Sequence, residues 1–340
     1  MRIALALLFL PISSCAAQEE PPRPHEHFLE LDAILPWDDG YLVGGLGDLD
    51  APPGGSDAVG RTRAWIGWAD ASGHLLRHLD LEEERSVMAL ARLADGGFLA
   101  CGAGWYGAFD LDGGTRSVVH GPVDWRSAAR GEDGTILLVG DRSGGPALAL
   151  HVGAAGEPIE ERELVSGAAT AREVAAAPGG GWVAIGWRWA EGTPTEGWVV
   201  RLDARGAPVW RSALTDPEDT YGQAIAPHAG GFVAVGFSGP TGSLRGWVRG
   251  LDPEGGETWT RDLVAGDLSE VAVGVRGEIY VLGRREGGGF LVRVDVPSEP
   301  EALPGRYPYA ATGDARDGSV LAGGMGPGGV WIERVVQGPR

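Results

Sequence analysis

Short apolar runs bounded by glycine recur along the chain and give the first structural prediction. Residues 181–186 and 231–236 are nearly identical examples, each with a glycine, four apolar residues and a closing glycine. Such runs of four or five apolar residues between turn signals are typical of buried β-strands. Seven of these runs occur, and their closing glycines are separated by 38 to 57 residues. The closing positions are Gly45, Gly102, Gly140, Gly186, Gly236, Gly283 and Gly324.

The segments around each run predict three further strands. A strand of small residues precedes the run, as in 172–176, and a third strand follows it, as in 197–202. The third and fourth strands are joined by Asp-x-x-Gly, which favours a type I turn with glycine at positive φ. This turn begins at Asp70, Asp110, Asp203 and Asp252. Four-stranded units of this length are typical of propeller blades, so we expect an all-β, seven-bladed β-propeller.

The last expected blade is incomplete. Its strands at 307–311, 319–323 and 330–336 are followed by only a few residues. A fourth strand would have to come from the N-terminus, around residues 24–29, or the blade keeps three strands. Because exposed strand edges are a liability, we expect the first and last blades to be adjacent.

The N-terminus predicts export. Arg2 precedes a short apolar run, residues 3–12, that is too short to span a bilayer and is typical of a signal peptide. It ends in Ile-Ser-Ser followed by Cys15, which resembles a bacterial lipobox. The alternative is an ordinary signal peptide that is cleaved near residues 16–18. We expect a signal peptide at 1–14, a flexible tether at 15–27 and one propeller domain at 28–340, anchored to the lipid bilayer through Cys15 and facing the periplasm or the cell surface.

The charge composition of the chain limits the classes of molecule that it could bind. The chain has 28 basic and 47 acidic residues, a net charge of −19, and every basic residue is arginine. This acidic balance argues against nucleic acid, because phosphate contacts need clustered basic side chains. If Cys15 carries lipid, Cys101 has no partner for a disulfide. Cys101 lies in an apolar run, so we expect a buried, unreactive thiol.

Two of the units allow a comparison with known repeats. Asp203, Gly206 and Trp210, and Asp252, Gly256 and Trp259, resemble the Asp…Gly…Trp end of a PQQ-like repeat. The chain as a whole resembles bacterial β-propeller lipoproteins with PQQ-like or delta-60-type repeats. Quinone-dependent dehydrogenases of that superfamily imply a calcium site and adjacent cysteines, and this chain has no cysteine pair. It is more similar to the outer-membrane assembly-factor lipoprotein, which usually implies eight blades.

Candidate binding residues lie on the face that carries the longer loops. Counting eight residues back from each turn gives one register in the first strands, and we expect it to ring the upper channel mouth. One interpretation of this register is a hydrated channel lining without a ligand, in which Arg126 and Arg172 are internal partners of the acids. The other is a binding site for a polar ligand or a cation such as Ca²⁺. The polar members are Asp32, Ser127, Glu173, Gln223 and Glu270, and the aromatic candidates in the loops are Trp105, Trp187 and Trp189.

The function expected from these features is binding rather than catalysis. The sequence has no Gly-x-Ser-x-Gly, phosphate loop or Cys-x-x-Cys, and we expect His228 on the opposite face, in a short turn. We therefore predict a non-catalytic, lipid-anchored binding or scaffold protein of the bacterial envelope, with an envelope protein or glycan as partner, no assigned metal ligands and no required cofactor. The alternative is a propeller enzyme, a lyase, hydrolase or sugar or quinone oxidoreductase, with an active site at the channel mouth.

Overall fold

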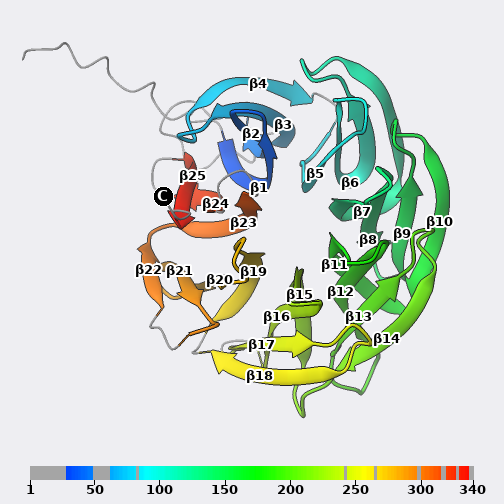
Figure 1. Cartoon of the computed structure of the whole chain (residues 1–340), viewed down its shortest axis with the longest axis vertical. Coiled ribbons are helices and arrows are strands. Elements are labelled where there is room, and N and C mark those ends of the chain that lie inside the picture. The colour runs from blue at the N-terminus through cyan, green and yellow to red at the C-terminus, as the bar shows by residue number, and fades with distance from the viewer. Residues whose placement is uncertain are drawn as a thin grey trace, which may run out of the picture.

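The computed structural model describes residues 28–48, 62–81, 84–240, 243–263, 266–296, 300–314, 319–326 and 329–336. The regular structure in these ranges consists of β-strands, β1 to β25, arranged as sheets around a central axis (Figure 1). No helix that could cross a membrane occurs among these residues. The predicted lipobox, signal peptide and tether lie outside the described residues, as does most of the long loop after β2.

The strands form six antiparallel sheets, and within each sheet neighbours in the chain are neighbours in space. The first sheet contains β1 (Phe28–Trp37), β2 (Gly40–Asp48), β3 (Thr62–Asp70) and β4 (Leu75–Leu81). The second contains β5 (Ala89–Arg92), β6 (Phe98–Phe109), β7 (Thr115–Arg130), β8 (Ile136–Asp141), β9 (Ala147–Val152) and β10 (Pro158–Val165). The third contains β11 (Ala168–Ala176), β12 (Trp182–Trp189), β13 (Glu196–Leu202) and β14 (Pro208–Leu214).

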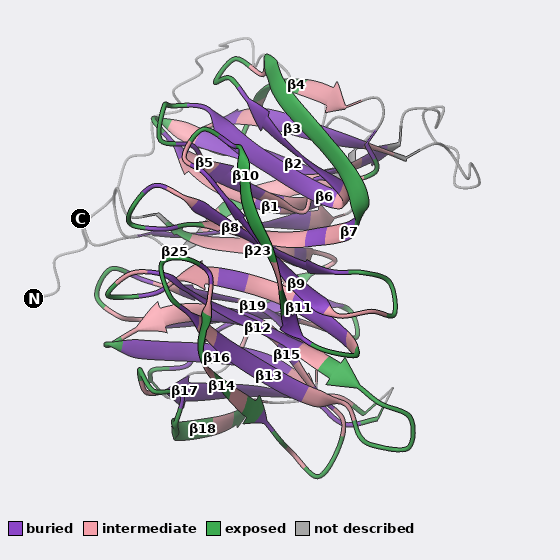
Figure 2. Ribbon diagram, turned by 90° about the vertical axis from the view of Figure 1, so that its right-hand side faces the viewer, coloured by how far each residue is buried: buried purple, intermediate pink, exposed green. Residues whose placement is uncertain are grey.

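The remaining three sheets complete the ring. The fourth contains β15 (Thr220–His228), β16 (Gly231–Ser238), β17 (Arg245–Leu251) and β18 (Glu257–Leu263). The fifth contains β19 (Asp267–Val273), β20 (Ile279–Arg285), β21 (Gly288–Arg293) and β22 (Glu301–Pro304). The sixth contains β23 (Tyr307–Asp314), β24 (Ser319–Gly326) and β25 (Gly329–Val336). Burial depends on the position of a strand within its sheet. The outer strands β10 and β18 are largely exposed, whereas the middle strands are buried (Figure 2).

The expected seven-bladed propeller of four-stranded blades is therefore wrong, because the described strands form six sheets of three to six strands. The second sheet has six strands and contains two of the glycine-bounded runs, 97–102 and 134–140. The reason is the continuity of β7, which pairs with β6 through residues 115–124 and with β8 through residues 124–130. Counting motifs in the sequence does not reveal that one strand continues from the outside of one repeat unit into the centre of the next.

The closing glycine of each apolar run has a packing reason. A Cβ at Gly186 would lie within 2.6 Å of the Trp198 ring and closer still to the backbone oxygen of Thr170 in β11. Only glycine allows this approach of β12 to the innermost strand. The inter-sheet core packs around such positions, and Trp182 and Trp198 lie in one buried cluster with Val139.

The predicted Asp-x-x-Gly turns are confirmed. In the turn after β13, the N–H of Gly206 donates to the carbonyl of Asp203 at 2.9 Å, and Gly206 has a φ of +74°. The Asp203 carboxylate accepts from the N–H groups of Arg205 and Ala207 at 2.8 and 2.9 Å. The side chain thus stabilises the turn that brings β14 back along β13.

The predicted adjacency of the first and last sheets is also confirmed. Strand β1 contacts β23, β24 and β25, and the guanidinium of Arg334 donates to the hydroxyl of Tyr41 at 2.7 Å. The sixth sheet has three strands among the described residues. Phe28 and Gly47 pair within the first sheet, so the start of β1 does not complete the sixth sheet.

Candidate functional site

The strands nearest the axis share a β-bulge at one level. In β11 the pairing with β12 shifts between Ala171 and Glu173, and β15 shifts between Gly222 and Ala224. The same irregularity occurs in β1, β7, β19 and β23. A bulge sets two residues opposite one and re-aims a side chain. Consecutive residues of an inner strand can therefore both face the axis.

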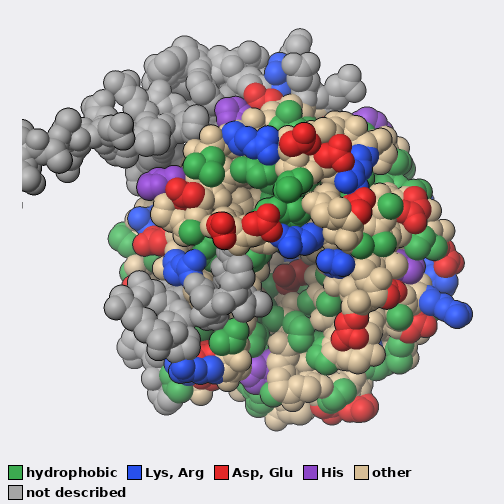
Figure 3. Space-filling view, turned by 45° about the horizontal axis from the view of Figure 1, so that its top comes forward, with side chains coloured by type: hydrophobic (Ala, Val, Ile, Leu, Met, Phe, Trp, Pro, Cys, Tyr) green, Lys and Arg blue, Asp and Glu red, His purple; other side chains and the backbone are tan. Residues whose placement is uncertain are grey.

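The bulged strands enclose a cavity of about 160 Å³ on the axis of the ring. Glu173 is the sixth of nine residues in β11 and Asp32 the fifth of ten in β1, so the cavity lies near mid-depth rather than at the predicted channel mouth. Figure 3 shows the centre of the ring hollowed, with acidic surface inside the hollow and basic surface beside it. All seven positions of the predicted register line this cavity, namely Asp32, Ala89, Ser127, Glu173, Gln223, Glu270 and Ala311.

The sequence predicted Arg126 and Arg172 as partners of this ring of residues, but it did not place Met88 or Tyr309 there. Arg126, Arg172, Met88 and Tyr309 also line the cavity, each immediately before a residue that faces it as well. Strict two-residue alternation would have sent them to the other side of the strand. The available signal was a pair of adjacent polar residues inside a strand of small apolar ones, as in Arg126-Ser127.

Two ring residues join neighbouring strands. The Glu173 carboxylate accepts a hydrogen bond from the backbone N–H of Ile225 in β15 at 2.5 Å. The Ser127 hydroxyl accepts one from the N–H of Val174 in β11 at 3.2 Å. These two side chains therefore have structural partners in the next sheet.

The other charged residues of the ring are only partly paired. Arg126 donates through Nε to the Asp141 carboxylate at 2.7 Å, and Arg172 donates through Nε to the Gln223 oxygen at 3.2 Å. Within the described part of the chain, Asp32 and Glu270 make no hydrogen bond or ion pair, and neither do the terminal nitrogens of Arg172. The cavity is therefore bordered by charges of both signs that the described protein groups leave unpaired.

Enclosure by protein changes the protonation of these groups. Burial raises the pKa of Asp32 to about 7, with a further upward contribution from Glu30, while Arg172 opposes it. Burial raises the pKa of Glu173 to about 8, and burial together with the charge of Glu173 raises the pKa of Glu270 well above its usual range. Burial also lowers the pKa of Arg172. Desolvation thus outweighs the attraction between these acids and the arginine.

The described residues do not contain three or more His, Cys, Asp or Glu side chains grouped so that they could hold a metal ion. Two arginines line the same cavity as the three acids. Positive side chains at this range oppose binding of a bare cation. The calcium ion considered from the sequence stays a prediction that no cluster in the described ranges supports.

Trp105 is not part of a binding surface, and its prediction as a loop residue was wrong. Its side chain has 0% exposure, packs with Phe98 and Phe109 in one core cluster and donates to the Ser86 carbonyl at 3.0 Å. Trp105 lies inside β6, where the sequence had suggested a loop after Gly102. A Cβ at Gly97 would clash with the Phe109 carbonyl oxygen, so the two halves of β6 lie side by side and the chain reverses near Gly104, which has a φ of +82°. No loop is left there to expose the indole.

Trp187 and Trp189 do lie on the face where the inner strands begin. Trp187 contacts Tyr221 edge-on, with ring centroids 5.7 Å apart, and Tyr221 stacks on Phe237. Trp189 is 41% exposed and lines a second cavity of about 550 Å³. Loops before β11, between β12 and β13, and before β15 form this cavity. Its polar lining includes Ser166, Arg188, Thr193, Thr195, Glu196 and Asp216.

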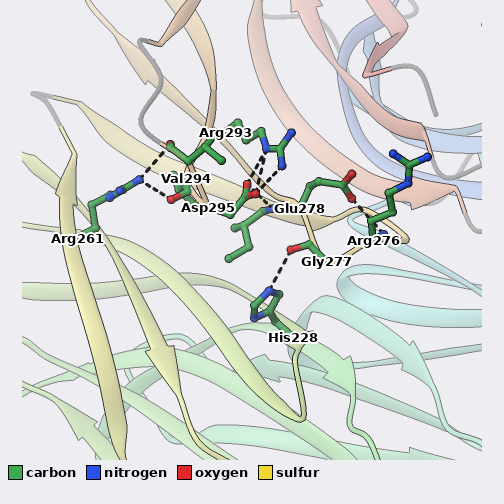
Figure 4. Close-up of polar contacts among 10 residues, drawn as sticks. His228, Arg261, Arg276, Gly277, Glu278, Arg293, Val294 and Asp295 are labelled. Atoms are coloured by element: carbon green, nitrogen blue, oxygen red, sulfur yellow. Dashed lines mark hydrogen bonds and ion pairs between the residues drawn. The ribbon is translucent and has the colours of Figure 1, made fainter. Parts of the chain in front are cut away.

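The opposite face carries short turns, as predicted. His228, at the end of β15, has its Nε2 3.0 Å from the Gly277 carbonyl in the turn before β20 (Figure 4). Nearby, Arg293 and Asp295 form an ion pair at 2.6 Å. These contacts hold turns together. Cys101 is buried, and burial raises the pKa of its thiol, which makes it unreactive.

Comparison with known proteins identifies the fold. No family model matches the chain, and no curated protein matches it. Among solved structures, the Neurospora crassa Pan2 WD40 domain has a TM-score of 0.61 at 10% identity, covering 92% of each chain. A catalytically inactive virginiamycin B lyase from Staphylococcus aureus with quinupristin has a TM-score of 0.59 at 11% identity, covering 92% of this chain and 97% of the lyase.

A third match is the β-propeller domain of the Trilobed protease from Pyrococcus furiosus. Its TM-score is 0.56 at 12% identity, and the match covers 92% of this chain and 99% of that domain. At such low identities these likenesses show the fold alone. The chain is an all-β β-propeller, and its function has to be argued from its own residues.

Proposed function

We propose that this chain is a non-catalytic, lipid-anchored binding protein of the bacterial cell envelope, and that the face bearing Trp189 binds a glycan. The exposed Trp189 beside a polar cavity is the observation that carries the proposal. A rigid ring that holds variable loops on one face is a common arrangement for binding.

The chemistry of the Trp189 cavity suits a sugar. An indole ring offers a flat apolar surface against which the C–H face of a sugar ring can be buried. Hydroxyls of Thr193 and Thr195 can exchange hydrogen bonds with sugar hydroxyls. Arg188 and Glu196 form an ion pair at 2.9 Å between the ends of β12 and β13 and add charged donors and acceptors. A cavity of about 550 Å³ is in the range of small-molecule sites.

Trp259 provides a matched control for a binding experiment. It is 37% exposed, close to the exposure of Trp189, but it lies on the outer strand β18 of another sheet. Titrations would use muropeptide fragments of peptidoglycan and lipopolysaccharide core oligosaccharides, followed by calorimetry and tryptophan fluorescence. We expect Trp189→Ala to weaken binding about tenfold or more and Trp259→Ala to leave it unchanged. Equal binding by both variants, or no binding of either glycan class, would overturn the glycan proposal.

The anchor is supported by the lipobox-like sequence that ends at Cys15. A single lipid cluster on this acidic chain would act without electrostatic help from anionic lipids. Cys15→Ser should release the protein from the membrane fraction and remove the lipid-modified N-terminal peptide. Retention of Cys15→Ser in the membrane fraction would contradict the anchor.

An enzyme is the second candidate, and one observation favours it. Burial raises the pKa of Glu173 to about 8 and raises the pKa of Glu270 well above its usual range, which favours the protonated state that a general acid needs. The Glu173 carboxylate is nevertheless held by the Ile225 N–H, a structural contact. We therefore place binding first and test catalysis directly with the glycan that binds.

A further inference from the structure

The central cavity offers a second site, separate from the Trp189 cavity. Residues of β1, β5, β7, β11, β15, β19 and β23 border it, and these strands approach the axis from all sides of the ring (Figure 1). Its volume of about 160 Å³ is close to that of a known protein cavity that accommodates benzene, so a ligand of about six non-hydrogen atoms fits. The hollow in Figure 3 leads towards it.

The lining excludes an apolar ligand. Three acids and two arginines border the cavity, and an apolar molecule would leave their charges without water or partners. It also disfavours a bare metal ion, because the arginines share the space with the acids. The ligand has to satisfy charges of both signs.

Some of the charged groups that line the cavity have partners within the protein, and the others are available to a ligand. Arg126 is held by Asp141, and Glu173 by the N–H of Ile225. Asp32, Glu270 and the terminal nitrogens of Arg172 have no partner among the described residues. Asp32, Glu270 and Arg172 all line the same cavity, so a single small ligand can reach the three groups.

We propose that this cavity binds a small zwitterion of amino-acid size, with its ammonium group between Asp32 and Glu270 and its carboxylate on the terminal nitrogens of Arg172. Burial favours the protonated forms of Asp32 and Glu270, and a cationic ammonium group beside them favours the ionised forms. The bound ammonium group thus supplies three donors to two carboxylates. A guanidinium can receive a carboxylate through two parallel hydrogen bonds. Each ligand charge thereby takes the place of water at a half-buried group of opposite sign.

This inference does not depend on the glycan proposal, because the two cavities share no residue. Failure of glycan binding at Trp189 would leave it standing, and its own failure would leave the glycan site standing. The two are separated further by the variants, since Trp189→Ala should not alter binding of a zwitterion.

The test is calorimetric titration of the full chain with glycine and L-alanine. Methylamine and acetate serve as probes that carry only one of the two charges. We expect saturable binding of the amino acids, with methylamine and acetate each weaker by about tenfold or more, because each leaves one buried charge without a partner.

Variants locate the site. Asp32→Asn and Glu270→Gln keep the side-chain shape and remove a charge, and each should weaken binding about tenfold or more. Glu163→Gln is the matched control, because Glu163 is exposed on β10 away from the cavity. Circular dichroism and urea unfolding check that each variant is folded, and if one of the two does not fold the other decides.

Three results would overturn the proposal. No saturable binding of either amino acid at concentrations up to roughly 10 mM would show that the cavity holds only water. Methylamine binding as tightly as glycine would remove the role given to Arg172. Unchanged affinity in the folded cavity variants would place the amino acid elsewhere on the protein.

Discussion

The Glu173 carboxylate in β11 accepts a hydrogen bond from the backbone N–H of Ile225 in β15, 52 residues further along the chain. The two strands belong to neighbouring sheets. A polar side chain at the axis therefore helps to join sheets, in addition to the apolar packing between them. The position of Glu173 beside the cavity is in this sense structural.

Substitutions at Glu173 separate the hydrogen bond from the charge. Glu173→Gln keeps an oxygen acceptor for the Ile225 N–H and removes an ionisable group whose pKa burial raises to about 8. We expect Glu173→Gln to be neutral or stabilising above pH 8. Glu173→Ala leaves a buried N–H without an acceptor, and we expect a loss of about 1–3 kcal/mol in the free energy of unfolding. Equal stability of the two variants in urea would contradict the role of the hydrogen bond.

The residues that line the central cavity show how much of the candidate site could be predicted from the sequence. One register, counted back from each turn, predicted Asp32, Glu173 and Glu270 together, because each lies the same number of residues before the turn into the following strand. The bulges were not predictable from alternation, so Met88 and Tyr309 were not assigned to the cavity, and Arg126 and Arg172 were expected only as neighbours of the register. The depth was also misjudged, because a register does not show how far a strand continues on either side.

Stability should fall as the pH rises from about 4 to about 8. In the unfolded chain a carboxyl titrates near pH 4, whereas burial raises the pKa of Asp32 to about 7 in the folded protein. Between these values the folded state binds more protons than the unfolded state, so the free energy of unfolding decreases with pH. The stabilisation due to this group is complete below pH 4 and lost as the pH passes 7.

Urea midpoints at pH 5 and pH 8.5 measure this dependence. Asp32→Asn removes the titrating group and should reduce the difference between the two midpoints. Glu163→Gln, with its exposed carboxylate on β10, should retain the difference of the parent protein. A difference that is the same in Asp32→Asn and in the parent would show that the acids of the ring do not control it.

A turn glycine receives the tryptophan of the preceding sheet. Gly255 has a φ of +86°, and a Cβ there would lie 2.6 Å from the ring of Trp210, whose indole donates to the Pro253 carbonyl at 2.9 Å. Gly230, with a φ of +84° and no atom within 4 Å of a Cβ, is the control. Both alanine variants should lose about 1–2 kcal/mol through backbone strain, and Gly255→Ala should lose at least about 1 kcal/mol more through the clash.

A double-mutant cycle isolates that clash. In a Trp210→Ala background, Gly255→Ala should cost no more than Gly230→Ala, because the ring is gone. Chemical denaturation of the four combinations gives the coupling energy. A coupling near zero would show that Trp210 does not rest on this turn in solution.

Closure of the ring depends on β1. Leu31 is fully buried in a cluster with Leu321 of β24 and Ala310 of β23, so it packs the first sheet against the last. Leu31→Ala should cost about 2–5 kcal/mol, as for other buried leucines. Leu76→Ala on the outer strand β4, where the side chain is 68% exposed, should change stability by less than about 0.5 kcal/mol. A small effect of Leu31→Ala would argue against tight closure.

The aromatic candidates divide for a physical reason. Trp105, Trp187 and Trp189 all follow a closing glycine, and the sequence treated all three as loop residues. The chain turns back at once at Gly104, so Trp105 enters the next strand segment and is buried. Strand β12 continues to Trp189 before it ends, which leaves that indole at the rim. The length of the loop after the closing glycine decides whether the tryptophan is exposed, and the residue types alone do not reveal that length.

The most direct test of the proposed function is to incubate the full, lipid-anchored chain with the glycan fraction that it retains and to analyse both the bound and the free glycan by mass spectrometry. Binding without catalysis predicts that the glycan is recovered with unchanged mass, and that Trp189→Ala reduces the amount retained while Trp259→Ala does not. Time-dependent appearance of glycan fragments or of products with altered mass, abolished by Glu270→Gln, would contradict this prediction and establish an enzyme.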